Sequence, residues 1–271
     1  MTRAELILEI RKKSSMLCVG LDTDIKKIPK HLLAAADPVF EFNKAIIDAT
    51  ADLCVAYKPN LAFYEELGPA GLESLKKTID YLPGNLFTIG DAKRGDIGNT
   101  GQKYARAYFE FYGFDAITVS PLMGRDSVEP FLAFPGKWTI LLALTSNPGS
   151  ADFQLTTLDS GRPFFEKVIS ASSQWAGPDQ LMYVVGATRY QSLKAIRNII
   201  PDHFLLIPGI GAQGGDLEEV IQNGRNADEG LIINASRSIL YADDTRDFYK
   251  AARKEASSLA EKMKKIMENF S

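Results

Sequence analysis

Eight short apolar segments recur along the chain, and each is rich in β-branched, aliphatic or aromatic residues. Most of them are apolar at successive rather than alternate positions, which is typical of parallel strands that are buried on both faces. The pattern predicts strands at residues 16–22, 54–59, 86–93, 116–120, 139–144, 181–186, 204–209 and 230–236.

Segments with helical periodicity lie between these strands. Apolar residues of 39–53 recur along one stripe, and Asp37-Pro38 supplies a capping side chain and a proline for the first helical position. Further helices are predicted at 101–113, which ends at Gly113, at 188–200, which stops before Pro201, and at 245–269.

The alternation of strand and helix, with a repeat of about 30 residues, predicts an α/β protein that folds as a (β/α)8 TIM barrel. No break in composition marks a second domain, so residues 1–271 are expected to form a single barrel domain. An open doubly wound sheet is the alternative, but the even spacing of the strands and a closing helix favour the barrel. The longest connection, 146–163, is polar and is expected to be a functional or mobile loop.

Composition narrows the function. The formal net charge of −3 argues against a dedicated nucleic-acid binder. No long apolar run or signal peptide is visible, so we expect a cytoplasmic protein without a membrane span. Cys18 and Cys54 lie in apolar runs and are expected to be buried free thiols. His31 and His203 are the two histidines of the sequence, which excludes a histidine-rich metal site.

The active site of such a barrel lies at the carboxyl ends of its strands. The polar residues expected at those ends are Asp22, Lys58, Asp91, Lys93, Ser120, Thr145, Ser146 and Arg237.

Charged residues concentrate after the third predicted strand. Asp91 and Lys93 are two residues apart, so both side chains would point to the barrel axis if the chain is still extended there. Asp96 and Thr100 would share a face if the next helix has begun. Together with Lys58 from the neighbouring strand, these residues predict an alternating array in which carboxylates and ammonium groups keep each other charged.

This array has other interpretations. It could be a structural salt-bridge network, although buried charges rarely improve stability over apolar packing. Asp22, Asp91 and Asp96 could hold Mg²⁺, but two lysines in the same cluster would repel the ion. A Schiff base on Lys93 is a further alternative, yet the flanking carboxylates would hold that amine as ammonium. No nucleophile–histidine pair is visible, which argues against acyl transfer.

A glycine-rich loop, PGIGAQGG at 208–215, follows the seventh predicted strand. It matches the Gly-x-Gly-x-x-Gly dinucleotide spacing, but that motif normally follows a first strand. A phosphate cradle fits better, because barrels bind phosphate with the loops after strands seven and eight. Gln213 could donate from its amide and Arg237 from its guanidinium. The alternative is a simple turn with a surface arginine. These residues predict an enzyme that acts on a phosphorylated small molecule without a cofactor.

The segment from Asp91 to Thr100, DAKRGDIGNT, resembles the signature of the orotidine 5′-phosphate decarboxylase family. Its shorter part, D-x-K-x-x-D, also occurs in related sugar-phosphate decarboxylases. The order and spacing of further matches agree from about residue 16 to 240, and the long connection 146–163 resembles the longer bacterial branch. These matches are Gly20-Leu21-Asp22, Lys58-Pro59-Asn60, 145–149, 208–215 and Arg237-Ser238.

The resemblance implies the last step of UMP synthesis, the decarboxylation of orotidine 5′-phosphate, with no cofactor and no metal. It implies a homodimer in which Asp96 and Thr100 reach across the interface. It also implies Lys93 as proton donor to C6, Asp91 beside the departing carboxylate and Lys58 ordering the array. Substrate contacts are implied for Asp22 (ribose), Ser146 (pyrimidine), Pro208 (near the base), and Gln213 and Arg237 (phosphate).

One position departs from the family pattern, since Ser236 stands where a glycine often precedes the phosphate-binding arginine. Two rival functions follow from the same residues. One is a metal-assisted sugar-phosphate decarboxylase or isomerase, and the other is a phosphate-ligand sensor without catalytic activity.

Overall fold

The computed structural model describes residues 1–210 and 215–269. Its eight strands are all parallel and close into one barrel in chain order, so the (β/α)8 prediction is confirmed and the open-sheet alternative is wrong. Each strand begins and ends within about two residues of its predicted bounds. The strands are β1 (Leu17–Leu21), β2 (Ala56–Pro59), β3 (Phe87–Arg94), β4 (Ala116–Val119), β5 (Trp138–Leu144), β6 (Leu181–Val185), β7 (Leu205–Pro208) and β8 (Leu231–Ala235).

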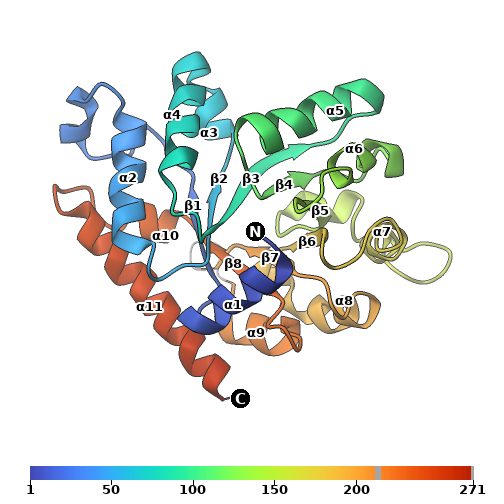
Figure 1. Ribbon diagram of the computed structural model, residues 1–271. Coiled ribbons are helices and arrows are strands. Elements are labelled where there is room, and N and C mark those ends of the chain that lie inside the picture. The colour runs from blue at the N-terminus through green and yellow to red at the C-terminus, as the bar shows by residue number, and fades with distance from the viewer. Residues whose placement is uncertain (211–214, 270–271) are drawn as a thin grey trace.

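Helices surround the strands as an outer ring (Figure 1). The α-helices are α1 (Arg3–Lys13), α2 (Pro38–Thr50), α3 (Ala62–Glu65), α4 (Gly68–Tyr81), α5 (Gly98–Arg106), α6 (Glu129–Leu132), α7 (Phe164–Ser172), α8 (Leu193–Ile199), α9 (Leu217–Gly224), α10 (Arg237–Leu240) and α11 (Phe248–Glu268). Short 3₁₀ turns span Lys30–Ala34, Arg125–Ser127, Pro148–Asp152 and Ala187–Ser192, and a π-helical turn, η2, spans Ala107–Phe111.

Local sequence signals explain several helix ends. The Asp37 carboxylate accepts the Phe40 N–H at 3.1 Å and Pro38 opens α2, as predicted. Two predicted helices need correction. The segment 188–200 begins as a 3₁₀ turn before it becomes α8, and α5 begins three residues before the predicted start and widens into η2.

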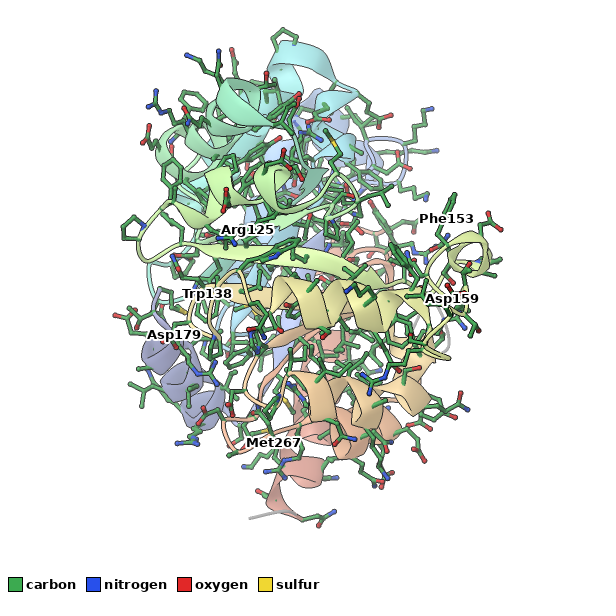
Figure 2. All side chains as sticks on the ribbon, turned by 90° about the vertical axis from the view of Figure 1, so that its right-hand side faces the viewer. Arg125, Trp138, Phe153, Asp159, Asp179 and Met267 are labelled. Atoms are coloured by element: carbon green, nitrogen blue, oxygen red, sulfur yellow. The ribbon has the colours of Figure 1, made fainter. Side chains whose placement is uncertain are left out.

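The amino-terminal end of the barrel is closed by α1. Arg3 donates to the carbonyl oxygens of Pro178 and Asp202, in the connections before β6 and β7, and the Trp138 indole donates to Met1 O at 2.9 Å. Figure 2 shows Trp138 and Asp179 at this end of the molecule and Phe153 and Asp159 at the other. The long connection 146–163 therefore lies at the carboxyl ends of the strands, where space for a ligand remains.

The barrel strands are buried almost throughout, and the core includes both cysteines as free thiols, as predicted. In the parts of the chain that the structure describes, no helix has the length and apolar character that crossing a bilayer requires.

Candidate active site

Two adjoining hollows open at the carboxyl ends of the strands, and both are lined by Lys58, Asp91 and Pro208. The first has a volume of about 180 Å³, and its further lining residues are Asp22, Asn60, Gly209, Ile210, Asn234, Ser236 and Arg237. The second has a volume of about 250 Å³, and its further lining residues are Lys93, Thr118, Leu142, Thr145, Ser146, Asn147, Val184 and Leu206.

Lys58 and Asp91 form a buried ion pair where the two hollows meet. Lys58 Nζ lies 2.9 Å from Asp91 Oδ2, and the two side chains are 4% and 11% exposed. Burial alone would lower the pKa of Lys58, but the charges of Asp91 and Asp22 outweigh it and raise that pKa well above its usual value. Burial likewise opposes ionisation of Asp91, yet Lys58 and Lys93 hold its pKa far below the usual range. Both groups therefore stay charged.

Lys93 extends the array on the other side of the same carboxylate. Its Nζ lies 2.6 Å from Asp91 Oδ1, its side chain is half exposed, and the residue lines the second hollow. The predicted contact is present, but the extended backbone behind that prediction is wrong. Lys93 has a φ of 49°, in the left-handed region. From Gly90 to Arg94, β3 advances four residues while β4 advances two, so a bulge re-aims the side chain.

Thr118 on β4 completes this part of the site, and the sequence analysis missed it. Its Oγ1 accepts the Lys93 N–H at 2.9 Å and donates to Asp91 Oδ1 at 3.0 Å. Ser120, named as the polar residue of this strand end, instead donates its N–H to Arg94 O at 2.7 Å. A polar residue inside an otherwise apolar strand was the available signal for Thr118.

Asp22 lines the first hollow. Its Oδ1 is buried and has no hydrogen-bond partner among the described residues, while its backbone oxygen accepts from Tyr241 at 2.7 Å. A buried carboxylate oxygen without a donor is costly unless a ligand supplies one. This geometry suits a hydroxyl-bearing ligand. Asn60, at the end of β2, lines the same hollow and was not assigned a role from sequence.

Arg237, at the start of α10, also lines the first hollow, with Ser236 and Asn234 before it. The Ser236 hydroxyl accepts from Asn234 Nδ2 at 3.2 Å. A Cβ on Gly20 would come within 1.8 Å of Ser236 Oγ, so a residue without a side chain is required on β1 opposite this serine. Gln213 lies outside the described residues.

The second hollow has one polar and one apolar wall. Thr145, Ser146 and Asn147 follow β5, and the Thr145 N–H donates to the Gln154 side chain at 2.7 Å, which ties the strand end to the long loop. Arg189, in the 3₁₀ turn after β6, also binds the long loop, because its Nη2 donates to Ser150 Oγ at 2.8 Å. The opposite wall consists of Leu142, Val184 and Leu206. Such a slot suits a flat ring with polar edges.

Asp96 and Thr100 do not join the array within this chain. Asp96 precedes α5, which begins at Gly98, so the helical face that the two residues were predicted to share does not form. Its carboxylate accepts the Ile97 N–H at 2.8 Å, and Thr100 is exposed. Seven of the ten predicted site residues thus line the two hollows; these two do not, and Gln213 is not described.

The arrangement offers fixed charges rather than a metal cage. Among the residues described, no three His, Cys, Asp or Glu side chains are grouped as metal ligands, so Asp22, Asp91 and Asp96 do not form the alternative Mg²⁺ site. An ammonium held against a carboxylate can stabilise a developing negative charge without reorganisation.

Comparisons with known proteins agree with this geometry. Residues 15–252 match the model of the family described as Orotidine 5′-phosphate decarboxylase / HUMPS family. A Phocaeicola vulgatus protein named orotidine 5′-phosphate decarboxylase is 57% identical over 98% of this chain and 99% of its own length. A Christiangramia forsetii protein of the same name is 57% identical over the full length of both chains.

Solved structures give the same result. The Leishmania donovani OMP decarboxylase superposes with a TM-score of 0.81 at 35% identity, covering 96% of this chain and 99% of its own. The Plasmodium berghei orotidine 5′-monophosphate decarboxylase has a TM-score of 0.83 at 26% identity, and the match covers 98% of each chain. The chain therefore belongs to the orotidine 5′-phosphate decarboxylase / HUMPS family.

Proposed function

We propose that this chain decarboxylates orotidine 5′-phosphate to uridine 5′-phosphate and CO₂ without a cofactor, with Lys93 as the proton donor. The observation that carries the proposal is the contiguous Lys58–Asp91–Lys93 array, with both ion-pair distances below 3 Å, where the two hollows meet. Family membership and near full-length relatives of that name support the same reaction.

The chemistry is a single exchange of substituents at C6 of the pyrimidine. The bond between C6 and the carboxylate carbon breaks, its electron pair stays on C6, and CO₂ leaves. Lys93 Nζ then transfers a proton to C6, and the resulting neutral amine regains a proton from solvent, because half of its side chain is exposed. A fixed ammonium beside C6 stabilises the carbanion as it forms, and general-acid catalysis of this kind contributes roughly 10²–10⁴-fold.

Asp91 and Lys58 prepare that ammonium. Asp91 accepts from both lysines and so holds Lys93 Nζ in one place. Lys58 in turn keeps Asp91 ionised, because its buried charge opposes protonation of the carboxylate. A carboxylate at this place would also repel the carboxylate of the substrate and favour the departure of CO₂.

The two hollows suggest how the substrate lies. Arg237 would pair with the phosphate in the first hollow, together with Gln213, and Asp22 would accept from the ribose. The pyrimidine would fill the second hollow between Ser146 and the apolar wall, with Pro208 at the junction. The phosphate is remote from C6, so its binding energy can order the site around the reacting atoms.

We also infer a homodimer in which Asp96 and Thr100 complete the partner's site. Both residues lie outside the hollows of their own chain. Apolar side chains are exposed beside them, with Ile97 51%, Leu122 72% and Met123 56% accessible. The Ser120–Arg94 hydrogen bond brings the segment before Leu122 against the segment before Ile97. A second copy of the chain would cover these side chains.

The cytoplasm is the compartment we propose for this activity. Cys18 and Cys54 are both free and buried, which suits a compartment that keeps thiols reduced.

The absorbance change of orotidine 5′-phosphate tests the reaction directly. Purified protein with EDTA present should consume this substrate and release uridine 5′-phosphate in equal amount. Activity that is absent with EDTA and returns with Mg²⁺ on a sugar-phosphate acid would replace the proposal with a metal-assisted relative. Binding of uridine 5′-phosphate without any turnover would replace it with a sensor.

A further inference from the structure

The backbone of Lys93 is strained, and the strain lies inside a strand. Its φ of 49° places it in the left-handed region, whereas the residues on either side belong to β3. A residue with a Cβ is about 1–2 kcal/mol less stable in this conformation. It persists only where neighbouring groups hold it, and such positions gather at functional sites.

Arg94 holds the chain on both sides of Lys93. Its side chain folds back along the strand, and Nη1 donates to Ala92 O at 2.7 Å, which spans the strained residue. Its own backbone oxygen accepts the Ser120 N–H at 2.7 Å. The peptide before Lys93 is therefore bonded to the Arg94 side chain, and the peptide between Arg94 and Gly95 is bonded to Ser120 at the end of β4.

The guanidinium of Arg94 is itself held from three directions. Its Nη2 forms an ion pair with Glu65 on α3. Its central carbon, Cζ, lies over two aromatic rings, 5.7 Å from the ring centroid of Tyr104 and 5.8 Å from that of Tyr108. Tyr104 belongs to α5 and Tyr108, which is buried, to the π-helical turn η2. A planar group with several donors can make all these contacts at once, and a lysine ammonium cannot.

We propose that Arg94 is a positioning residue that holds Lys93 in its left-handed conformation and so keeps Nζ against Asp91. Arg94 does not line either hollow within the described residues, so it acts through Lys93 rather than on the substrate. The inference rests on the proposed function for its kinetic consequence, but the position of Lys93 can be observed independently of the reaction.

The kinetic test compares Arg94→Met with the wild type. We expect kcat to fall roughly 10- to 100-fold, as misplacement of a catalytic group by about 1 Å does. The KM and the affinity for uridine 5′-phosphate should stay within about threefold, because the residues placed around the phosphate and ribose are unchanged. Arg94→Lys should not restore kcat, whereas millimolar guanidinium ion should partly restore it in Arg94→Ala.

A matched control is available on the far side of the molecule. Arg253 on α11 binds both carboxylate oxygens of Asp52 at 2.8 Å and Ala49 O at 2.7 Å, so it also joins a carboxylate to a backbone oxygen. Arg253→Met should leave kcat unchanged. An unchanged kcat in Arg94→Met overturns the proposal, as does a loss of uridine 5′-phosphate affinity as large as the loss of kcat.

A crystal structure of Arg94→Met separates this inference from the proposed function. Lys93 Nζ beyond hydrogen-bond distance of Asp91 Oδ1 supports the positioning role even if the wild type shows no decarboxylation. An unmoved Lys93 overturns that role even if the wild type is an active decarboxylase.

Discussion

Lys93 Nζ lies 2.6 Å from Asp91 Oδ1, although the backbone between them leaves the extended conformation at Lys93 itself. A regular strand would also place these side chains on one face, but the bulge in β3 makes room for Thr118 to bond both residues. The ammonium is thus aimed by its backbone as well as by its partner. Asp91, shared by two lysines, is the centre of the site.

Removal of the Lys93 amine should abolish turnover without preventing ligand binding. We expect Lys93→Ala to lower kcat by about 10³-fold or more, because the variant lacks both the proposed proton donor and the positive charge that we propose lies beside C6. Uridine 5′-phosphate should still bind, which calorimetry would show. Lys194→Ala, a change at an exposed lysine on α8, is the control. Near-native turnover by Lys93→Ala would contradict the assigned role.

The Lys58–Asp91 pair should affect stability and activity differently. Asp91→Asn leaves the buried Lys58 ammonium without its carboxylate, and we expect unfolding free energy to fall by about 3 kcal/mol. The double variant Lys58→Met/Asp91→Leu removes both charges and should regain most of that stability while remaining inactive. Urea unfolding measures the stability of each variant, and the absorbance of orotidine 5′-phosphate measures its activity. A double variant as unstable as Asp91→Asn would show that packing, rather than the unpaired charge, causes the loss.

The fold was predictable because its signals are local. Continuous apolar runs such as 139–144 mark strands buried on both faces, and polar residues such as Lys58 mark where those runs end. The bounds of α5 were harder to predict, because no proline or capping side chain precedes Gly98 and the π-helical turn lacks a signature.

Details of the site depend on non-local register. A lysine gives no sign of a left-handed backbone, since glycine and asparagine are the usual residues there. The role of Thr118 exists only because β4 pairs out of step with β3 at the bulge. The distance of Asp96 from the array follows from where α5 begins, which spacing alone left open.

Arg237 should contribute to phosphate binding specifically. With Arg237→Ala we expect the affinity for uridine 5′-phosphate to weaken by about 2–4 kcal/mol, or roughly 30- to 1000-fold, as loss of a charge-assisted contact does. Affinity for uridine, which has no phosphate, should not change. Titration calorimetry with the two ligands measures both. Equal weakening for both ligands, or none for either, would remove Arg237 from the phosphate site.

The proposed sharing of Asp96 between subunits predicts complementation between two inactive variants. In a heterodimer of Lys93→Ala with Asp96→Ala, one site has an intact Lys93 and receives an intact Asp96, while the other site has neither. Random mixing makes half of the dimers heterodimers, so about a quarter of wild-type activity should return. Refolding the two chains together and measuring kcat tests this. A mixture that stays as inactive as its components would rule out sharing through Asp96.

The burial of His203 predicts that the folded protein loses stability in acid, independently of catalysis. The side chain is only 8% exposed and packs against the Tyr183 ring at the opposite end of the barrel from the site. Burial lowers the pKa of His203 to about 4, and Arg3 and Arg197 also disfavour its charged form. The unfolded chain, with a histidine pKa of about 6.5, takes up the proton first. The stability contributed by neutral His203 is therefore complete above pH 6.5 and is lost as the pH falls towards 4.

Protonation of His203 should lower the unfolding free energy by up to about 3 kcal/mol. Urea unfolding between pH 7.5 and 4.5 would measure this decrease. Carboxylates titrate in the same range, so the informative quantity is the difference between the wild type and His203→Phe, which keeps an aromatic ring without a titrating group. As the pH falls, the unfolding free energy of the wild type should decrease relative to that of His203→Phe by up to about 3 kcal/mol. His31→Gln, a change at the exposed histidine, should follow the wild type. A difference that stays constant across the range would show that His203 does not couple folding to protons.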